Sequence, residues 1–216
     1  MAKVTTAVAV GMSVYAILYL SDLLGLLGIH IMTVPHRAII VTFLLILSLL
    51  VLPMRKSAPK DKVPWYDILL MVPGIAGPLY VVFSWESLSD RFAHQEFFAY
   101  EIVLAALTTI VLLEATRRVL GWAMPLISII FVAYMFFAGY CPGFLYTDSV
   151  GLSRAAALLF YSESGIWGIA MGVAATIIIM FMIFSQLLVK TGAGQAFIDF
   201  AMALLGHVRG GPAKVA

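Results

Sequence analysis

The chain has 216 residues, of which 63% are hydrophobic and only 11% are charged, and its formal net charge at pH 7 is +2. Soluble domains carry about 25% charged residues, so the composition excludes a soluble globular protein and indicates an integral membrane protein. The single cysteine, Cys141, excludes an intrachain disulfide, and the four histidines are not spaced as metal ligands. The sequence has no basic face with interleaved aromatic residues, so nucleic acid is not an expected partner.

Six apolar segments are predicted to cross the bilayer as helices, because its hydrocarbon core of about 30 Å is spanned by about 20 helical residues. In chain order they cover about residues 4–29, 38–52, 65–85, 97–113, 120–140 and 166–189. The first segment is too long for the apolar region of a signal peptide and is interpreted as a retained helix. The third is interrupted by prolines and glycines between Pro73 and Pro78, which packed membrane helices tolerate.

The segments between these spans are polar or short. Residues 54–62 and 86–96 are predicted to be loops. Residues 153–162 are too few to span a bilayer and suit an interfacial helix. A short C-terminal helix is predicted over residues 195–205, after a glycine break at residues 192–194. The expected fold class is therefore an all-α integral membrane protein with about six transmembrane helices, a short interfacial helix and a short C-terminal helix.

The distribution of basic residues predicts the orientation of these spans, because short cytoplasmic loops are enriched in Lys and Arg. With the N-terminus inside, six spans place ten basic residues on the inner side and three on the outer side. The outer residues are Arg37, Arg91 and Arg154, and the inner ones are Lys3, Arg55, Lys56, Lys60, Lys62, Arg117, Arg118, Lys190, Arg209 and Lys214. Both ends of the chain are thus expected in the cytoplasm.

The ionisable residues within the apolar segments are candidates for function, since a charge at the bilayer centre costs several kcal/mol. Asp22, Asp67, Glu101 and Glu114 all lie within about two turns of a predicted segment end. Anchoring of the helix ends is the main interpretation, and a polar contact with a neighbouring helix is the alternative for Glu101. Glu114 is placed to pair with Arg117 or Arg118 at i,i+3 or i,i+4, which forms a charge cluster between the fourth and fifth spans.

The sixth span contains a G-x-x-x-G pattern formed by Gly168 and Gly172. Small residues at this spacing let another helix approach closely, so these two glycines are predicted to serve helix packing. A substrate path lined by the same glycines is the alternative. The sequence shows no nucleophile elbow, phosphate loop or pair of catalytic carboxylates, so catalytic residues, cofactor-binding residues and a metal site are not expected.

Several stretches resemble the large membrane subunit of tripartite ATP-independent periplasmic (TRAP) transporters. They are GWAMP at 121–125, SRA at 153–155 with LFY at 159–161, FMIFSQLLVKTGAG at 181–194, FID at 197–199 and GHVRGG at 206–211. The preceding part, with HRA at 36–38, VPWYD at 63–67 and LEATRRVLGWAMP at 113–125, is similar to the variety in which small and large subunits share one chain. That variety is typically served by TAXI-class binding proteins.

The resemblance implies two parts, a small-subunit-like four-helix scaffold over residues 1–118 and the beginning of the large subunit over residues 119–216. It also implies uptake of small organic anions such as carboxylates across the bacterial inner membrane, delivered by a periplasmic solute-binding protein and driven by sodium. In that family two re-entrant hairpins hold sodium and substrate, and these sites are expected beyond Ala216. No other cofactor is expected, and the partners implied are the lipid bilayer, the binding protein and the remainder of the large membrane subunit.

The residues GGPAKVA at 210–216 look like a turn followed by the first turn of another apolar helix, so the chain is expected to be an N-terminal fragment. We therefore expect it not to transport alone. Two alternatives stay open, a membrane scaffold or assembly protein without transport activity of its own and, with no catalytic residues to support it, a membrane-embedded enzyme.

Overall fold

The computed structural model describes residues 2–53, 65–94 and 97–205, and these residues form helices and connecting segments without a β-strand. Six of the helical stretches are long and apolar enough to cross a membrane. The predicted fold class, an all-α membrane protein with six spans, is therefore confirmed. The predicted loop at 54–62 and the GHVRGG motif at 206–211 lie outside the described residues.

Thirteen helical elements follow one another in the described residues. Their bounds are α1 Ala2–Leu20, α2 Leu23–Leu26, α3 Thr33–Val51, α4 Trp65–His94, α5 Ala99–Leu120, α6 Ala123–Phe137, the 3-10 turns η1 Ala138–Tyr140 and η2 Gly143–Leu145, α7 Leu152–Phe160, α8 Ile169–Val173, the π-helical turn η3 Ala174–Ile178, α9 Ile179–Thr191 and α10 Ala193–Leu205. The helical stretch from α8 through α9 is the sixth span.

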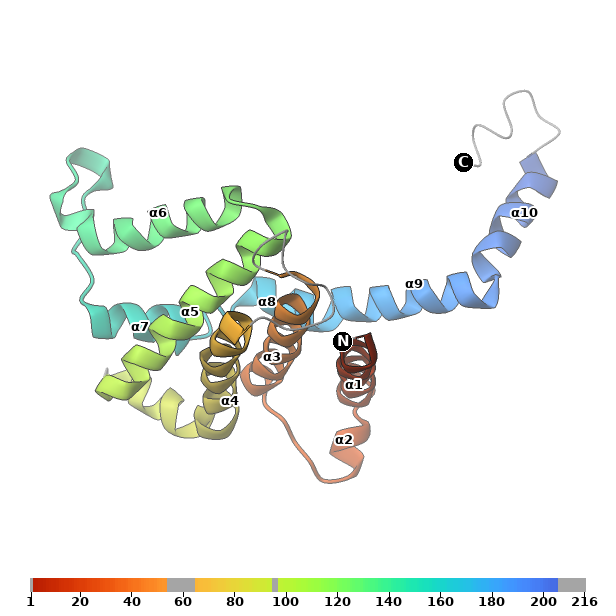
Figure 1. Ribbon diagram of the computed structural model, residues 1–216, viewed down its shortest axis with the longest axis horizontal. Helices are drawn as coiled ribbons and strands as arrows, with labels where there is room; N and C mark the ends of the chain where they lie inside the picture. Colours follow the sequence, from red (N-terminus) through yellow and green to blue (C-terminus); the bar gives the residue numbers. More distant parts are fainter. Residues whose placement is uncertain (1, 54–64, 95–96, 206–216) are drawn as a thin grey trace. The chain divides into compact units, whose positions relative to one another are not determined.

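The chain divides into two compact units, residues 1–175 and 176–216. In the first unit, α3 lies between α1 and α4, and α5 packs on α4 (Figure 1). Each of these four helices runs antiparallel to the next. The end of α1 contacts the start of α3, the end of α3 and the start of α4 bind the same Arg118 side chain, and the end of α4 contacts the start of α5. Buried apolar residues of α3, α4 and α5 form the core, together with Phe160, Tyr161 and Trp167 from the segment around the end of α7.

The closest approach within this core joins α4 to α5. A Cβ atom added at Gly77 would lie 1.9 Å from Thr108 Oγ1, and one added at Gly74 would lie 2.9 Å from a methyl carbon of Val111. Thr108 Oγ1 also donates a hydrogen bond to the Pro73 carbonyl at 3.0 Å. Two glycines three residues apart share one face of a helix, so the segment that looked like an interruption is the contact surface of a continuous helix.

Two predicted spans differ most from the observed helices, by nine residues each. α1 ends at Leu20, nine residues earlier than predicted, because Asp22 adopts a left-handed backbone conformation with φ 55° and breaks the helix. α4 continues to His94, through most of the predicted loop at 86–96, because that polar stretch contains no glycine or proline. At 1.5 Å per residue its 30 residues reach about 45 Å, so α4 is longer than the hydrocarbon core is thick. Its polar C-terminal turns can therefore extend beyond the hydrocarbon core as a helix.

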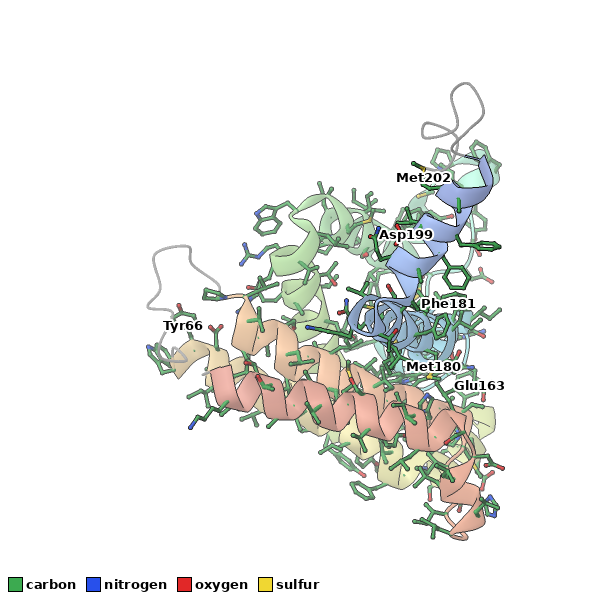
Figure 2. The ribbon with its side chains drawn as sticks, turned by 90° about the vertical axis from the view of Figure 1, so that its right-hand side faces the viewer. Tyr66, Glu163, Met180, Phe181, Asp199 and Met202 are labelled. Atoms are coloured by element: carbon green, nitrogen blue, oxygen red, sulfur yellow. The ribbon has the colours of Figure 1, made fainter. Side chains whose placement is uncertain are left out.

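The second unit is described from residue 176 to residue 205 and consists mainly of α9 and α10. Gly192 separates the two helices with φ 74°, a left-handed conformation that glycine adopts without steric cost. Figure 2 shows Met180 and Phe181 on α9 and Asp199 and Met202 on α10. All four side chains are exposed, and Asp199 accepts a hydrogen bond of 3.0 Å from Gln195 one turn earlier.

Candidate functional site

Three buried ionisable side chains of the described first unit, His36, Asp67 and Glu101, lie near helix ends, and each is the centre of a group of polar contacts. We name these groups by their central residue. The Asp67 cluster comprises Asp67, Glu114, Arg117 and Arg118, the Glu101 cluster comprises Tyr80, Arg91, Glu101 and Tyr161, and the His36 cluster comprises Tyr15, Tyr19, His36 and Arg37 with the backbone carbonyls of Trp167 and Ala175.

The Asp67 cluster joins the end of α3, the start of α4 and the end of α5. Arg118 Nη2 donates to Asp67 Oδ1 at 2.6 Å, and the two side chains are 2% and 0% exposed. Arg118 Nη1 donates to the Leu52 carbonyl at 3.0 Å, just after α3. Oδ2 of Asp67 is buried and has no hydrogen-bond partner among the described residues. A charge buried in this way is tolerated only because it is paired, so the guanidinium fixes three helix ends against one another.

Glu114 extends this cluster along α5. It accepts hydrogen bonds from Arg117 Nε at 2.7 Å and from Arg118 Nε at 2.9 Å. The i,i+3 and i,i+4 pairs considered from the sequence therefore form at the same time. The Arg117 guanidinium also lies over the ring of Trp122, 5.1 Å from its centroid. All three charged residues lie inside α5, which ends at Leu120. The predicted boundary between the two subunit-like parts, at residue 118, falls within this helix and stays a prediction.

The Glu101 cluster lies at the opposite end of the α4–α5 pair. Arg91 of α4 donates from Nη2 to Glu101 Oε1 at 2.7 Å and from Nη1 to Oε2 at 3.1 Å, and the Glu101 side chain is 0% exposed. The hydroxyl of Tyr80 donates to Oε1, and the Phe98 backbone N–H donates to Oε2 at 2.8 Å. Glu101 thus caps the start of α5 and contacts a neighbouring helix, which combines the two interpretations made from its sequence position.

Tyr161 connects this cluster to the segment that follows α7. Its hydroxyl donates to the backbone carbonyl of Glu101 at 2.8 Å, and its ring stacks on Phe97 with a centroid distance of 5.2 Å. Burial, followed by the nearby negative charge of Glu101, raises the pKa of the Tyr161 hydroxyl above its ordinary value. The hydroxyl therefore stays protonated and remains a donor over the whole physiological pH range.

The His36 cluster joins α1, the start of α3 and the sixth span. His36 is 1% exposed, its Nε2 lies 3.3 Å from the Ala175 carbonyl, and its Nδ1 lies 3.1 Å from the Tyr15 hydroxyl. A carbonyl can only accept, so Nε2 must carry a proton, and in the neutral ring Nδ1 accepts from Tyr15. The ring of Tyr19 stacks on His36 at 3.5 Å between centroids. One buried imidazole therefore contacts two other helices.

Arg37 makes a second link from α3 to the segment before α8. Its Nη1 donates to the Trp167 carbonyl, and the Trp167 ring is itself buried, with Nε1 donating to the Phe160 carbonyl. The predicted packing residue Gly172 lies beside this guanidinium, because a Cβ added there would be 3.0 Å from Arg37 Nη2. Gly168 precedes α8 and is close to the backbone of residues 163–165. Their assignment to helix packing stays a prediction.

Sequence reasoning missed the contacts of the buried His36 and the half-buried Arg37, because it began the second span at residue 38 and counted Arg37 with the outer side. α3 begins at Thr33, with Pro35 in its first turn. Proline is favoured at helix starts, where backbone N–H groups lack partners in any case. Pro35 was therefore the signal that could have extended the span. No local sequence pattern predicted that Tyr80, Arg91 and Tyr161 would all contact Glu101.

Two open clefts flank the segment between α2 and α3, and His30 and Ile31 line both. The one beside α4, of about 380 Å³, also contacts Trp85 and Glu86, and the one beside α2, of about 330 Å³, contacts Asp22. Neither includes the central residue of a cluster. Among the described residues, no group of three or more His, Cys, Asp or Glu side chains is placed to hold a metal ion. The contacts of the three clusters fix helices against one another.

Comparison with known proteins gives one family. Residues 107–216, just over half of the chain, match the model described as "Tripartite ATP-independent periplasmic transporter, DctM component". The match begins inside α5 and covers α6 to α10 and the residues after them. Searches of curated proteins and of solved structures found no match. This is a family of transporters and not of enzymes, and the chain, a multi-pass membrane protein, belongs to the DctM family of TRAP transporter membrane components.

Proposed function

We propose that the chain is a membrane component of a sodium-coupled secondary transporter that takes up small organic anions such as carboxylates from a periplasmic solute-binding protein. The observation that carries this proposal is the DctM match over residues 107–216 in a chain with six candidate spans. Residues 1–118 would supply a scaffold in the inner membrane, with both chain ends in the cytoplasm. The α6 to α10 region would supply opening helices of the transporting part.

The geometry of the first unit supports the scaffold part of this proposal. The Asp67 and Glu101 clusters tie the two ends of the α4–α5 pair, and the residues between them, such as Val81, Ala105 and Val111, are buried and apolar. Charges at helix ends and an apolar middle are what a static membrane bundle needs, because unpaired charge at mid-depth is costly. A rigid bundle of this kind would serve as the fixed scaffold relative to which a transport domain moves.

The direct test is uptake into proteoliposomes that contain the purified protein. The liposomes receive an inward sodium gradient, a panel of radiolabelled monocarboxylates and dicarboxylates, and the solute-binding protein encoded beside the gene. Uptake that needs sodium and the binding protein supports the proposal, with a potassium gradient and omission of the binding protein as controls. The 216-residue chain and any longer product of the same reading frame are assayed in parallel.

The outcomes separate the candidate functions. Uptake that persists without sodium, or without the binding protein, contradicts the coupling or the delivery step, respectively. Absence of uptake by every product of the frame, with correctly inserted protein, contradicts transport and favours the alternative of a membrane scaffold without transport activity of its own. We expect the 216-residue chain alone to give no uptake.

A further inference from the structure

The sixth span departs from regular α-helix at one place within the membrane. α8 (Ile169–Val173) is followed by the π-helical turn η3 (Ala174–Ile178) and then by α9 (Ile179–Thr191). A π-helical turn shifts the backbone hydrogen bonds from i+4 to i+5 and is uncommon, and such turns are frequent at functional sites and at helix bends. The sequence there, AATII, contains neither glycine nor proline, so no local breaker residue explains the turn.

Side chains from α3 hold the backbone up to this turn. Arg37 donates to the Trp167 carbonyl just before α8, and His36 donates to the Ala175 carbonyl at the beginning of η3. A backbone carbonyl has two lone pairs, so Ala175 can accept from an imidazole in addition to any backbone donor. The two consecutive residues of α3 therefore contact both ends of α8, and Gly172 between these points leaves room for the guanidinium.

His36 is itself fixed, so it can serve as an anchor. Tyr15 donates to its second ring nitrogen, the Tyr19 ring stacks on its face, and its side chain is withdrawn from solvent. The neighbouring charged group on α3, the Arg37 guanidinium, donates its hydrogen bond to the Trp167 carbonyl. The compact first unit ends at Ala175, whose carbonyl accepts the hydrogen bond from His36.

We infer that His36 and Arg37 are positioning residues that fix the sixth span to α3 as far as Ala175, and that the π-helical turn over residues 174–178 is the pivot about which the following helix moves. The inference rests on the proposed function for its role in transport, where a pivot would join the static bundle to a moving part. Its structural content, an anchored segment followed by a hinge, holds or fails without any uptake measurement.

The test is pulsed electron paramagnetic resonance on the full chain in lipid nanodiscs, in a background where Cys141→Ser removes the native thiol. One spin label replaces exposed Leu107 on α5, and a second replaces either exposed Ile169 before the turn or exposed Val189 after it. We expect a narrow distance distribution for the pair 107–169 and one about two-fold broader for the pair 107–189. Equal widths for the two pairs overturn the pivot.

The anchor is tested with matched variants in the 107–169 pair. His36→Phe keeps a ring that stacks on Tyr19 but removes both polar contacts, and it is expected to broaden the distribution about two-fold. His36→Gln keeps an amide donor of similar reach and is expected to restore the narrow distribution, which a merely space-filling role for His36 would not predict. Arg37→Met keeps the apolar stem and removes the donor to the Trp167 carbonyl. It is expected to broaden the 107–169 distance distribution independently of His36.

Two results overturn the anchor. One is an unchanged 107–169 distribution in both His36→Phe and Arg37→Met, and the other is equal broadening by His36→Gln and His36→Phe. If His36→Phe does not fold, Arg37→Met and the unsubstituted chain still decide the question. Absence of uptake by every product of the reading frame in the proteoliposome assay, together with the expected distance distributions, would contradict the proposed function while leaving the hinge intact.

Discussion

Asp67→Asn removes one charge from the most deeply buried ion pair of the described chain and leaves the Arg118 guanidinium without its closest carboxylate. The N–O distance is 2.6 Å, and both side chains are almost completely buried. Removing one partner of a buried pair costs about 3–5 kcal/mol. Arg118 keeps Glu114 as a second, partly exposed carboxylate, so we expect the lower end, about 3 kcal/mol, or about a hundred-fold in the unfolding equilibrium.

The assay is equilibrium unfolding of the detergent-solubilised protein by SDS, followed by tryptophan fluorescence. Glu86→Gln is the matched control, because it makes the same carboxylate-to-amide change on the same helix at an exposed position. Its free energy of unfolding should stay within about 0.5 kcal/mol of the unsubstituted protein. Asp67→Asn should unfold at a clearly lower SDS fraction.

A double variant separates the ion pair from simple misfitting of the side chain. Asp67→Asn combined with Arg118→Met removes both charges, so the buried guanidinium that makes the single variant costly is gone. The combined loss of stability should therefore fall below the sum of the two single losses by about 2 kcal/mol. Additive losses, or an Asp67→Asn variant as stable as Glu86→Gln, would refute the reasoning.

Three further predictions use the same unfolding assay or a labelling assay. Tyr161→Phe keeps the stacked ring but loses the hydrogen bond to the start of α5, and it should lower the free energy of unfolding by about 1 kcal/mol. Gly77→Ala places a methyl group against Thr108 and should cost about 2–3 kcal/mol, whereas Gly194→Ala, with open space around it, should change stability by less than about 1 kcal/mol. Cys141, which is partly exposed, should react with a membrane-impermeant thiol reagent in intact cells; reaction only after permeabilisation would reverse the predicted orientation.

The six spans could be predicted from the sequence because the hydrophobic signal is long and continuous, whereas their ends could not. Polarity after residue 85 was interpreted as a loop, yet it marks where α4 leaves the hydrocarbon core rather than where the helix ends. Conversely, the apolar residues 23–29 were assigned to the first span, although Asp22 interrupts the backbone before them. Hydropathy reports the surrounding solvent, and helix ends depend on local backbone conformation.

The partners within the polar clusters could be predicted only where they are close in sequence. Glu114 and the arginines one turn later follow from helix periodicity. The contacts of Glu101 with Arg91 and Tyr161 depend on how α4 and the segment after α7 fold back, and the second of these spans 60 residues. For the same reason, the closest glycine contact between long helices in the described bundle, Gly77 against Thr108, was hidden in a stretch that resembled a helix break.

The three clusters share one physical arrangement, which explains how their polar side chains are accommodated in a membrane protein. In each cluster a charged or ring side chain near a helix end contacts a backbone carbonyl or an opposite charge in another segment, as Arg118 does at Leu52 and Arg37 at Trp167. This satisfies groups that would otherwise be costly in lipid, and it fixes helices at their ends while their middles pack through apolar contacts. The π-helical turn over residues 174–178 lies where the His36 contacts stop. A transporter component needs a segment that moves relative to its fixed bundle. The hydrogen bonds that His36 and Arg37 of α3 donate to the sixth span and the segment before it lead up to this turn.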